Sequence, residues 1–210
     1  MSGFVCSGNV FVKNQRRPCA PLGRGLQRGK RSLNISSRPA AVKQQLLEAI
    51  ASLDEGRAII DDKDAQERVE DQIRELEALN QFPQTISSEL LDGSWNLKYT
   101  TSKVILGKNL PGVFQYVRGS NRQILNTKDL TGVNKVKTKF AGLFEFEYVI
   151  QLSLTARPPQ RALVKFENVK LGPFTFNLSF GVGYIDVTYI DDDLRITRGS
   201  EGNVFILVRE

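Results

Sequence analysis

The chain has 210 residues and a formal net charge of +6, from 29 lysines and arginines against 23 acidic residues. This length predicts one domain, with room for a small appendage. The basic excess is confined to residues 1–41, which hold eight basic residues and no acidic one, whereas the remainder carries 21 basic and 23 acidic residues. Because a nucleic-acid-binding domain concentrates positive charge on its folded body, we expect no nucleic-acid partner.

The side chains needed for most enzyme chemistry are missing. The chain has no histidine, and both cysteines, Cys6 and Cys19, lie in the basic N-terminal segment. The body therefore offers no Ser-His-Asp triad, cysteine nucleophile, His/Cys metal site or disulfide. It has no phosphate loop G-x-x-x-x-G-K-S/T and no strand-linked G-x-G-x-x-G, so no cofactor is expected. Acid–base catalysis would fall to carboxylates, lysine or tyrosine, and we predict no enzyme and no catalytic residue.

Residues 1–40 have the composition of an organellar transit peptide. They are rich in Arg, Ser, Gly and Asn, lack acids, and contain no apolar run of secretory length. A disordered basic arm for nucleic acid or anionic lipid is the alternative. Composition alone leaves both chloroplast and mitochondrion open. We expect cleavage between Arg31 and Ala41, where the first helical pattern begins.

Residues 41–82 are predicted to form a pair of helices that packs on or beside a larger body. The first helix shows apolar residues at helical spacing: Val42, Leu46, Leu47, Ile50 and Leu53. The second has a narrower stripe of Val69, Ile73 and Leu76, an N-cap at Asp62 or Asp64, and an i,i+4 pair of Glu70 and Arg74. Its polar face is mostly acidic, which disfavours a role at a membrane surface.

From Ser94 the apolar period changes from helical to two, which predicts strands with one dry and one wet face. The expected strands are 94–101, 123–127, 133–140, 144–155, 161–169, 174–180, 184–190, 194–198 and 204–209. Closing such a meander buries its apolar face and removes its edges. We therefore predict a mainly β fold: an antiparallel barrel of about eight or nine strands over residues 83–210, preceded by the two helices.

A barrel of this size has an interior that side chains fill or that holds one small ligand. The inward positions are rich in aromatic residues: Trp95, Phe144, Phe146, Tyr148, Phe166, Phe174 and Phe176. Alternation is the same in a filled and a hollow barrel, so both alternatives stay open.

The C-terminal stretch, DDDLRITRGSEGNVFILVRE, predicts two hairpins. Asp191–Asp193 forms a polar turn, since Asp caps turns through its own side chain, and Gly199–Asn203 forms the next. The alternative for this stretch is that Arg195 or Arg198 neutralises a carboxylate or diphosphate head group of a ligand.

Three stretches of the chain resemble the plastid lipid-associated protein (PAP) family, also called fibrillins. They are ELEALNQFP, LLDGSWNLKYTTS and GYIDVTYIDDDLRITRGSEGNVFILVRE. The resemblance covers most of residues 42–210; it is most specific in the closing motif and looser over residues 103–177. Because the family is similar to lipocalins, the resemblance implies a lipocalin-like barrel. It also implies import into the chloroplast and association with plastoglobules or thylakoids. No catalytic residues are known for the family as a whole, so none is carried over.

Gly93-Ser94-Trp95 resembles the Gly-x-Trp that opens a lipocalin barrel. In that superfamily an arginine from near the end of the barrel packs over the tryptophan, a pair that contributes about 1 kcal/mol or more when desolvated. Arg195, Arg198 and Arg209 are the candidates here, and the sequence does not choose among them.

The leading hypothesis is a non-enzymatic protein that binds or coats carotenoids, prenylquinones or other plastid lipids at plastoglobules or thylakoids, with a stromal location also open. The alternative is a scaffold or chaperone for an enzyme of prenylquinone biosynthesis, docked through the helices. An apolar loop at residues 104–114 is our candidate for membrane contact. The predicted ligand-binding residues are Trp95, Tyr99, Phe144, Phe146, Tyr148, Phe166, Phe176, Arg195 and Arg198.

Overall fold

The computed structural model describes residues 38–108, 111–177 and 182–210. The predicted transit segment and its cleavage site therefore fall almost wholly outside the described residues. The elements are α1 (Arg38–Ile50), η2 (Arg57–Ile59), α2 (Lys63–Glu77), η3 (Thr85–Ser87), η4 (Glu89–Leu91), β1 (Gly93–Thr100), β2 (Phe114–Tyr116), β3 (Arg122–Asn126), β4 (Thr131–Phe140), β5 (Phe144–Arg157), β6 (Arg161–Leu171), β7 (Phe174–Asn177), β8 (Gly183–Ile190), β9 (Leu194–Gly199) and β10 (Val204–Arg209), where η marks a 3-10 turn.

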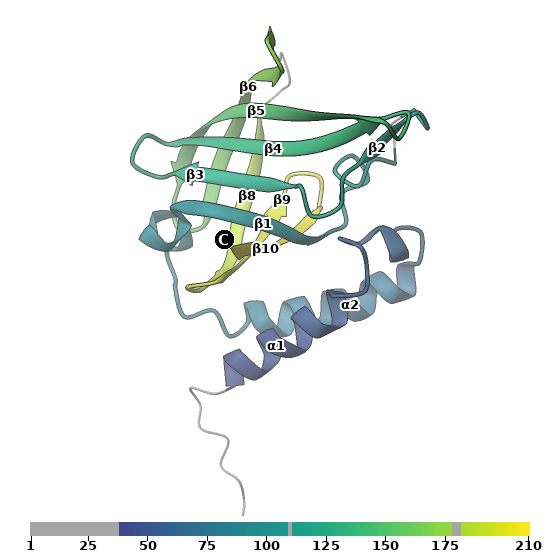
Figure 1. Ribbon diagram of the computed structural model, residues 1–210. Helices are drawn as coiled ribbons and strands as arrows, with labels where there is room; N and C mark the ends of the chain where they lie inside the picture. Colours follow the sequence, from purple (N-terminus) through teal and green to yellow (C-terminus); the bar gives the residue numbers. More distant parts are fainter. Residues whose placement is uncertain (1–37, 109–110, 178–181) are drawn as a thin grey trace, which may run out of the picture. The chain divides into compact units, whose positions relative to one another are not determined.

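Eight of these strands close into an antiparallel barrel (Figure 1). The order β3-β1-β10-β9-β8-β6-β5 is completed by β4, which pairs with both β5 and β3. The remaining two strands lie outside this ring, β2 on β4 and β7 on β6. The predicted fold class, a mainly β, lipocalin-like barrel after two helices, is confirmed. The one strand that the sequence missed is β2, because three residues are too few to display a period of two.

Strand bulges decide which side chains face the barrel interior. In β1, Leu97 pairs with Leu207 and Tyr99 with Ile206, so Lys98 is an extra residue without a partner in β10. An extra residue reverses the alternation beyond it. Tyr99 therefore lies on the opposite face of the sheet from Leu97, although the period of two predicted that they share a face. Similar register shifts occur between β8 and β9 and between β5 and β6.

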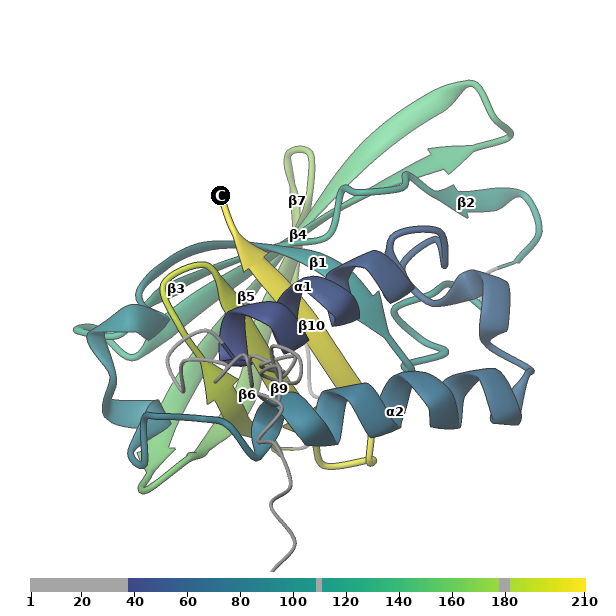
Figure 2. The same ribbon diagram turned by 90° about the horizontal axis from the view of Figure 1, so that it is seen from below.

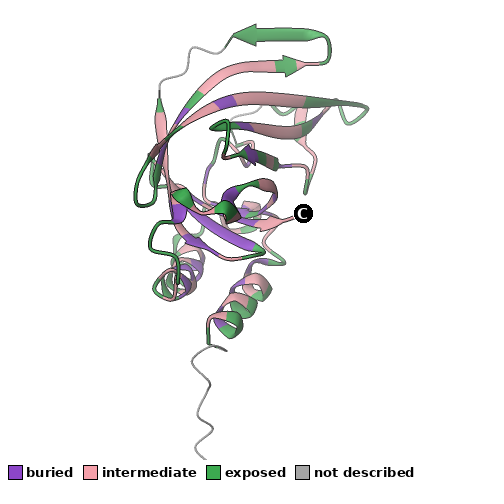
Figure 3. Ribbon diagram, turned by 90° about the vertical axis from the view of Figure 1, so that its left-hand side faces the viewer, coloured by how far each residue is buried: buried purple, intermediate pink, exposed green. Residues whose placement is uncertain are grey.

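The strands β1, β8, β9 and β10 are buried on both faces, and two separate cores result. Inside the barrel, one core contains Trp95, Leu97, Leu125, Val187, Ile190 and Leu207. Outside it, the helix-side core contains residues from α1, α2 and the outer face of the strands, among them Leu46, Ile73, Tyr99 and Ile196. Figure 2 shows α1 and α2 lying across β9 and β10, and Figure 3 shows burial concentrated beside the helices.

Both predicted helices are present, but α1 ends at Ile50 and leaves Leu53, predicted to belong to it, in the following turn. The Asp62 side chain accepts a hydrogen bond from the Ala65 N–H at 2.9 Å, so Asp62 rather than Asp64 is the N-cap of α2. The expected pair of Glu70 and Arg74 is present, with 3.2 Å between Oε1 and Nε. Among the described residues no helix is both long and apolar enough to cross a membrane.

Candidate lipid-binding site

One end of the barrel, beside η4, is built around Trp95, the only tryptophan of the chain. We call it the closed end. The indole Nε1 of Trp95 donates a hydrogen bond to the Leu91 carbonyl at 3.0 Å, which fixes η4 beneath the barrel. Two guanidinium groups lie over the ring, with the Cζ atoms of Arg209 and Arg195 at 4.3 and 4.8 Å from its centroid. The sequence left three arginines as candidates for this contact, and the structure assigns it to two of them.

Arg209 links three segments of the chain at the closed end of the barrel. Its Nη1 donates to the Asp92 carbonyl at 2.8 Å and its Nε to the Asp192 carbonyl at 2.7 Å, while Nη2 donates to the Leu90 carbonyl. One side chain therefore links the last strand, the turn between β8 and β9, and η4. Arg209 therefore stabilises the closed end, because all three nitrogens of its guanidinium donate hydrogen bonds to backbone carbonyls.

Arg195 is fully buried inside the barrel. Its Nη2 donates to the Gln123 side chain, but Nε and Nη1 have no hydrogen-bond partner among the described residues. Burial, and to a lesser degree the neighbouring Arg209, lowers the pKa of Arg195 to about 9. Arg195 borders a cavity of about 40 Å³, which is otherwise lined mainly by apolar side chains such as Leu154 and Val187.

This cavity is far too small for a carotenoid or a quinone, since sites for small organic molecules usually measure about 300–1,000 Å³. It has room for a water molecule or two, which would satisfy the Arg195 donors. The closed end of the barrel is therefore filled by side chains, which answers for this region the question of a filled or a hollow interior.

The nine residues predicted to bind a ligand fall into three groups. Trp95 and Arg195 lie together at the closed end. Tyr99 and Arg198 lie on the helix side of the sheet, Tyr99 because of the bulge at Lys98. The other five are spread along β5, β6 and β7: Phe144, Phe146 and Phe176 are exposed, and Tyr148 and Phe166 are half-buried. Their role in ligand binding stays a prediction.

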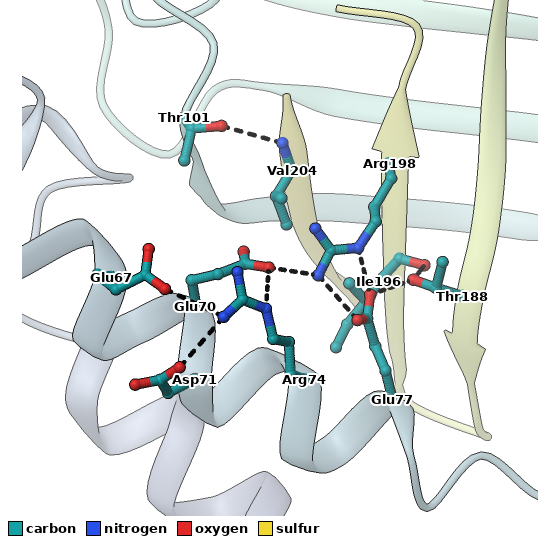
Figure 4. Close-up of polar contacts among 10 residues, drawn as sticks. All are labelled: Glu67, Glu70, Asp71, Arg74, Glu77, Thr101, Thr188, Ile196, Arg198 and Val204. Carbon is teal, nitrogen blue, oxygen red and sulfur yellow. Dashed lines mark hydrogen bonds and ion pairs between the residues drawn. The ribbon is translucent and has the colours of Figure 1, made fainter. Parts of the chain in front are cut away.

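Arg198 is engaged by two carboxylates of α2 (Figure 4). Its Nε and Nη2 donate to Oε1 and Oε2 of Glu77, both at 2.8 Å, and Nη2 also donates to Glu70 Oε1 at 2.7 Å. Hydrogen bonding to Glu77 in particular raises the pKa of Arg198 above its usual range. This network fastens α2 to β9, so the guanidinium is already neutralised without a ligand head group.

The acidic turn has the structural role that the sequence predicted. Asp191 Oδ1 accepts hydrogen bonds from the backbone N–H groups of Asp193 and Leu194, at 3.1 and 2.8 Å. Its Oδ2 accepts from Lys43 Nζ of α1 at 2.9 Å and from the Tyr189 hydroxyl at 2.7 Å. Burial raises the pKa of Asp191, but hydrogen bonding with Asp193, Lys43 and Tyr189 outweighs it and holds the pKa at about 2. Lys43, Tyr189 and Asp191 border a groove of about 190 Å³ beside α1.

The side of the barrel where β4, β5 and β6 extend past β3 and β8 is its open end. Two aromatic residues there, Phe114 of β2 and Phe140 of β4, were not among the predicted ligand-binding residues, although Phe114 ends the predicted membrane-contact loop. They are cross-strand partners, and their ring centroids lie 5.1 Å apart. The alternation Phe114, Tyr116 was a signal, but one too short to use. In the predicted membrane-contact loop, Val104 is 59% and Val113 41% exposed, whereas Leu106 is buried; residues 109–110 lie outside the described part.

A barrel with a Gly-x-Trp start, an arginine-covered tryptophan and helices on its outer face defines a lipocalin-like protein. The sequence of residues 40–208 matches the model of the PAP_fibrillin family. This match covers most of the chain, and the chain belongs to that family. No solved structure matches it.

Curated relatives agree with this assignment. "Probable plastid-lipid-associated protein 5, chloroplastic" of Arabidopsis thaliana is 31% identical over 169 residues, 79% of this chain and 68% of that protein. The "chromoplast-specific carotenoid-associated protein" of Cucumis sativus is 25% identical, over 80% of this chain and 67% of its own length. "Plastoglobulin-1, chloroplastic" of Pisum sativum is 25% identical, over 66% and 52%. The predicted location in the plastid is confirmed, in a family that includes a plastoglobulin, and the family's role is one of association with lipid.

Proposed function

We propose that this protein is a non-enzymatic lipid-associated protein that binds or coats carotenoids, prenylquinones or other plastid lipids at plastoglobules or thylakoids. The observation that carries the proposal is a group of exposed phenylalanines on β5 and β7. Phe144 is 61% and Phe176 54% exposed, although full burial of such a side chain stabilises by about 1.5–3 kcal/mol. Apolar molecules bound over these rings would supply that burial.

The ligand-contacting residues of the proposal are those at the open end of the barrel. Phe144, Phe146 and Phe176 provide the exposed rings, and Tyr148 and Phe166 continue the same surface toward the interior. Trp95 and Arg195 would form the closed base of the site. Residues 1–40 are proposed to be the chloroplast transit peptide, followed by the helical pair of residues 41–82 and the barrel of residues 83–210.

The absence of catalysis is part of the proposal. A general acid or base works best with a pKa near the working pH. Burial raises the pKa of Tyr99 to about 12, and burial together with Asp191 raises that of Tyr189, whereas the pKa of Asp191 is held at about 2. These three shifts move the pKa values of Tyr99, Tyr189 and Asp191 away from neutrality, so none of the three is suited to general acid–base catalysis.

The test is mass spectrometry of organic extracts from the protein isolated from plastids. We expect carotenoids or prenylquinones to be enriched over an equally abundant stromal protein isolated in parallel. A Phe146→Ser, Phe176→Ser variant should lose the enrichment. Extracts without prenyl lipid, or turnover of an ester or isoprenoid substrate by the pure protein, would contradict the proposal.

The scaffold hypothesis keeps one observation in its favour, the exposed acidic face of α2. Glu67 and Asp71 both point to solvent from this helix, with side chains 63% and 68% exposed. Deleting the helices would be a poor test, because they supply half of the helix-side core. Glu67→Lys with Asp71→Lys should instead abolish capture of a prenylquinone-synthesising enzyme and leave lipid binding intact. Unchanged capture would remove this hypothesis.

A further inference from the structure

Beyond the closed part of the barrel, one face of the sheet is aromatic and open. The strand β3 pairs with β4 only as far as Lys135, and β8 pairs with β6 only over Arg161–Val164. Past these points β4, β5 and β6 continue, joined by β2 and β7 at the edges. We call this five-stranded extension the overhang. Figure 1 shows it on the side of the barrel away from α1 and α2.

The strand register places the aromatic residues of the overhang on a single face. Directly paired residues in antiparallel strands share a face. Phe114 pairs with Phe140, and Phe140 with Phe144. Period two adds Phe146, and the pairing of β5, β6 and β7 adds Phe174 and Phe176 through Leu171 and Val169. The aromatic face is therefore Phe114, Phe140, Phe144, Phe146, Phe174 and Phe176.

Five of the six rings of this aromatic face are exposed to solvent, and Phe114 is half-buried. Phe174 is 64% and Phe144 61% exposed, and Leu143, at the turn between β4 and β5, is 81% exposed. The described positions with the same orientation on these five strands carry no charged residue. In Figure 3, β7 and the turn that joins it to β6 are coloured as exposed. A contiguous apolar surface of this kind marks a site of interaction.

The reverse face of the overhang is charged and carries a basic excess. Five lysines lie on it, against three glutamates, Glu145, Glu147 and Glu167: Lys135, Lys137, Lys139, Lys165 and Lys170. Two of these lysines form ion pairs, Lys137 Nζ with Glu145 Oε1 at 3.2 Å and Lys165 Nζ with Glu167 Oε2 at 3.0 Å. The overhang is thus an amphipathic sheet, with phenylalanine on one side and net positive charge on the other. Lysine stems are long enough to bring this charge to the level of lipid head groups while the rings reach the apolar layer.

These features favour a lipid surface over a single enclosed molecule. Neither of the two cavities described above is lined by a residue of the aromatic face. The rings are instead spread over four strands, β2, β4, β5 and β7, as a surface-binding element requires. The net positive charge beside them complements anionic head groups, each basic residue near such a surface contributing attraction that salt screens.

We propose that the overhang is the lipid-docking surface of this protein: its aromatic face enters a lipid monolayer or bilayer leaflet, and its lysines contact anionic head groups. The proposal rests on the lipid-associated function proposed above, and it goes further in naming the surface, the orientation and the head-group charge. The protein acts at this surface as a coat, with the closed end of the barrel and the helices facing water.

The test is flotation of the full chain with triacylglycerol droplets coated with phosphatidylcholine alone or with phosphatidylcholine and phosphatidylglycerol in equal parts. Phe144→Ser with Phe174→Ser should weaken binding to both droplets about a hundredfold, since two large apolar groups are removed. Phe82→Ser is the matched control, because Phe82 is 39% exposed but lies beyond α2, outside the overhang. It should bind like the wild type, and all variants share the same basic leader.

Lys139→Gln with Lys170→Gln should weaken binding to the anionic droplets about tenfold and leave binding to neutral droplets unchanged. Emission of the buried Trp95 and circular dichroism check that each variant is folded. If the double phenylalanine variant unfolds, the single substitutions Phe174→Ser and Phe176→Ser on the outermost strand replace it.

The outcomes separate the two proposals. A wild type that floats, together with a double phenylalanine variant that floats equally well, overturns the docking surface and keeps the lipid-associated function. A wild type that binds neither kind of droplet overturns the function itself. If the wild type forms a dimer without lipid and the double phenylalanine substitution dissociates it, the overhang binds a second copy of the chain instead. A loss of droplet binding in Phe82→Ser equal to that of the double variant would also count against the overhang as the docking surface. Unchanged binding of the lysine variant to anionic droplets overturns the head-group assignment.

Discussion

The contact between Arg198 and α2 offers a direct measure of how firmly the helices belong to the barrel. The guanidinium is 29% exposed, and its two partners, Glu70 and Glu77, are 17% and 16% exposed. Arg198→Met keeps the length of the side chain but leaves Glu77 without its cation and Glu70 with only the more exposed Arg74. Removing one partner of a fully buried pair costs about 3–5 kcal/mol, and partial exposure lowers this to about 2 kcal/mol.

For a folded body of this size, a loss of about 2 kcal/mol lowers Tm by about 4–8 °C. We expect that shift in thermal unfolding followed by circular dichroism. The double variant Arg198→Met, Glu77→Met should lose less than the two single variants together, with a coupling energy of about 1–2 kcal/mol. Arg74→Met is the matched control, since Arg74 pairs with the same Glu70 but its side chain is 56% exposed.

The control should leave Tm essentially where it is, because ion pairs between exposed groups contribute little. An Arg198→Met variant as stable as Arg74→Met would refute the reasoning. It would show that α2 is held by the helix-side core alone and that the charged network is incidental. In that case a helix pair that detaches to meet a partner becomes the better description, and the scaffold hypothesis gains support.

Two further predictions concern the barrel. Gly132→Ala should lower the free energy of unfolding in urea by about 1–2 kcal/mol, because the added Cβ would lie 2.6 Å from Leu152 Cδ1. Gly112→Ala, whose Cβ would have nothing within 4 Å, is the control and should be neutral. Equal effects of the two substitutions would disprove the close packing at Gly132. Asp191 has a folded pKa lowered to about 2 from 3.8, so its contribution is present above pH 4 and is lost between about pH 4 and 2. Asp191→Asn should therefore flatten the acid dependence of stability by about 1 kcal/mol after solvent screening, and an unchanged profile would contradict this.

Sequence periodicity predicted most strands closely because the alternation is long and regular in β4, β5 and β6. It failed at Tyr99 for a local reason that composition does not display. The extra residue Lys98 reverses the face of everything after it in β1, and a bulge has no residue signature strong enough to detect. The sequence also could not tell which of Arg195, Arg198 and Arg209 contacts Trp95, since that contact depends on the register between strands that are distant in sequence.

The placement of the phenylalanines shows a second limit of the sequence. Alternation predicted correctly that Phe144, Phe146 and Phe176 share a face with the barrel interior. It could not predict where the closed ring ends, because that depends on where β3 leaves β4 and β8 leaves β6. These are long-range pairings, and they turn predicted core residues into exposed ones. The candidate site was thus identified by residue type but not by its degree of burial.

The two proposed functions are compatible within one molecule because they use different sides of it. The helices cover β9 and β10, whereas the overhang is built from β2, β4, β5, β6 and β7 (Figures 1 and 2). A protein seated on lipid through its aromatic face would therefore leave the acidic face of α2 in water, free to meet a partner. Binding of an enzyme through Glu67 and Asp71 should then persist on droplets. Competition between droplets and enzyme for the same chain would mean that one of the two surfaces has been misassigned.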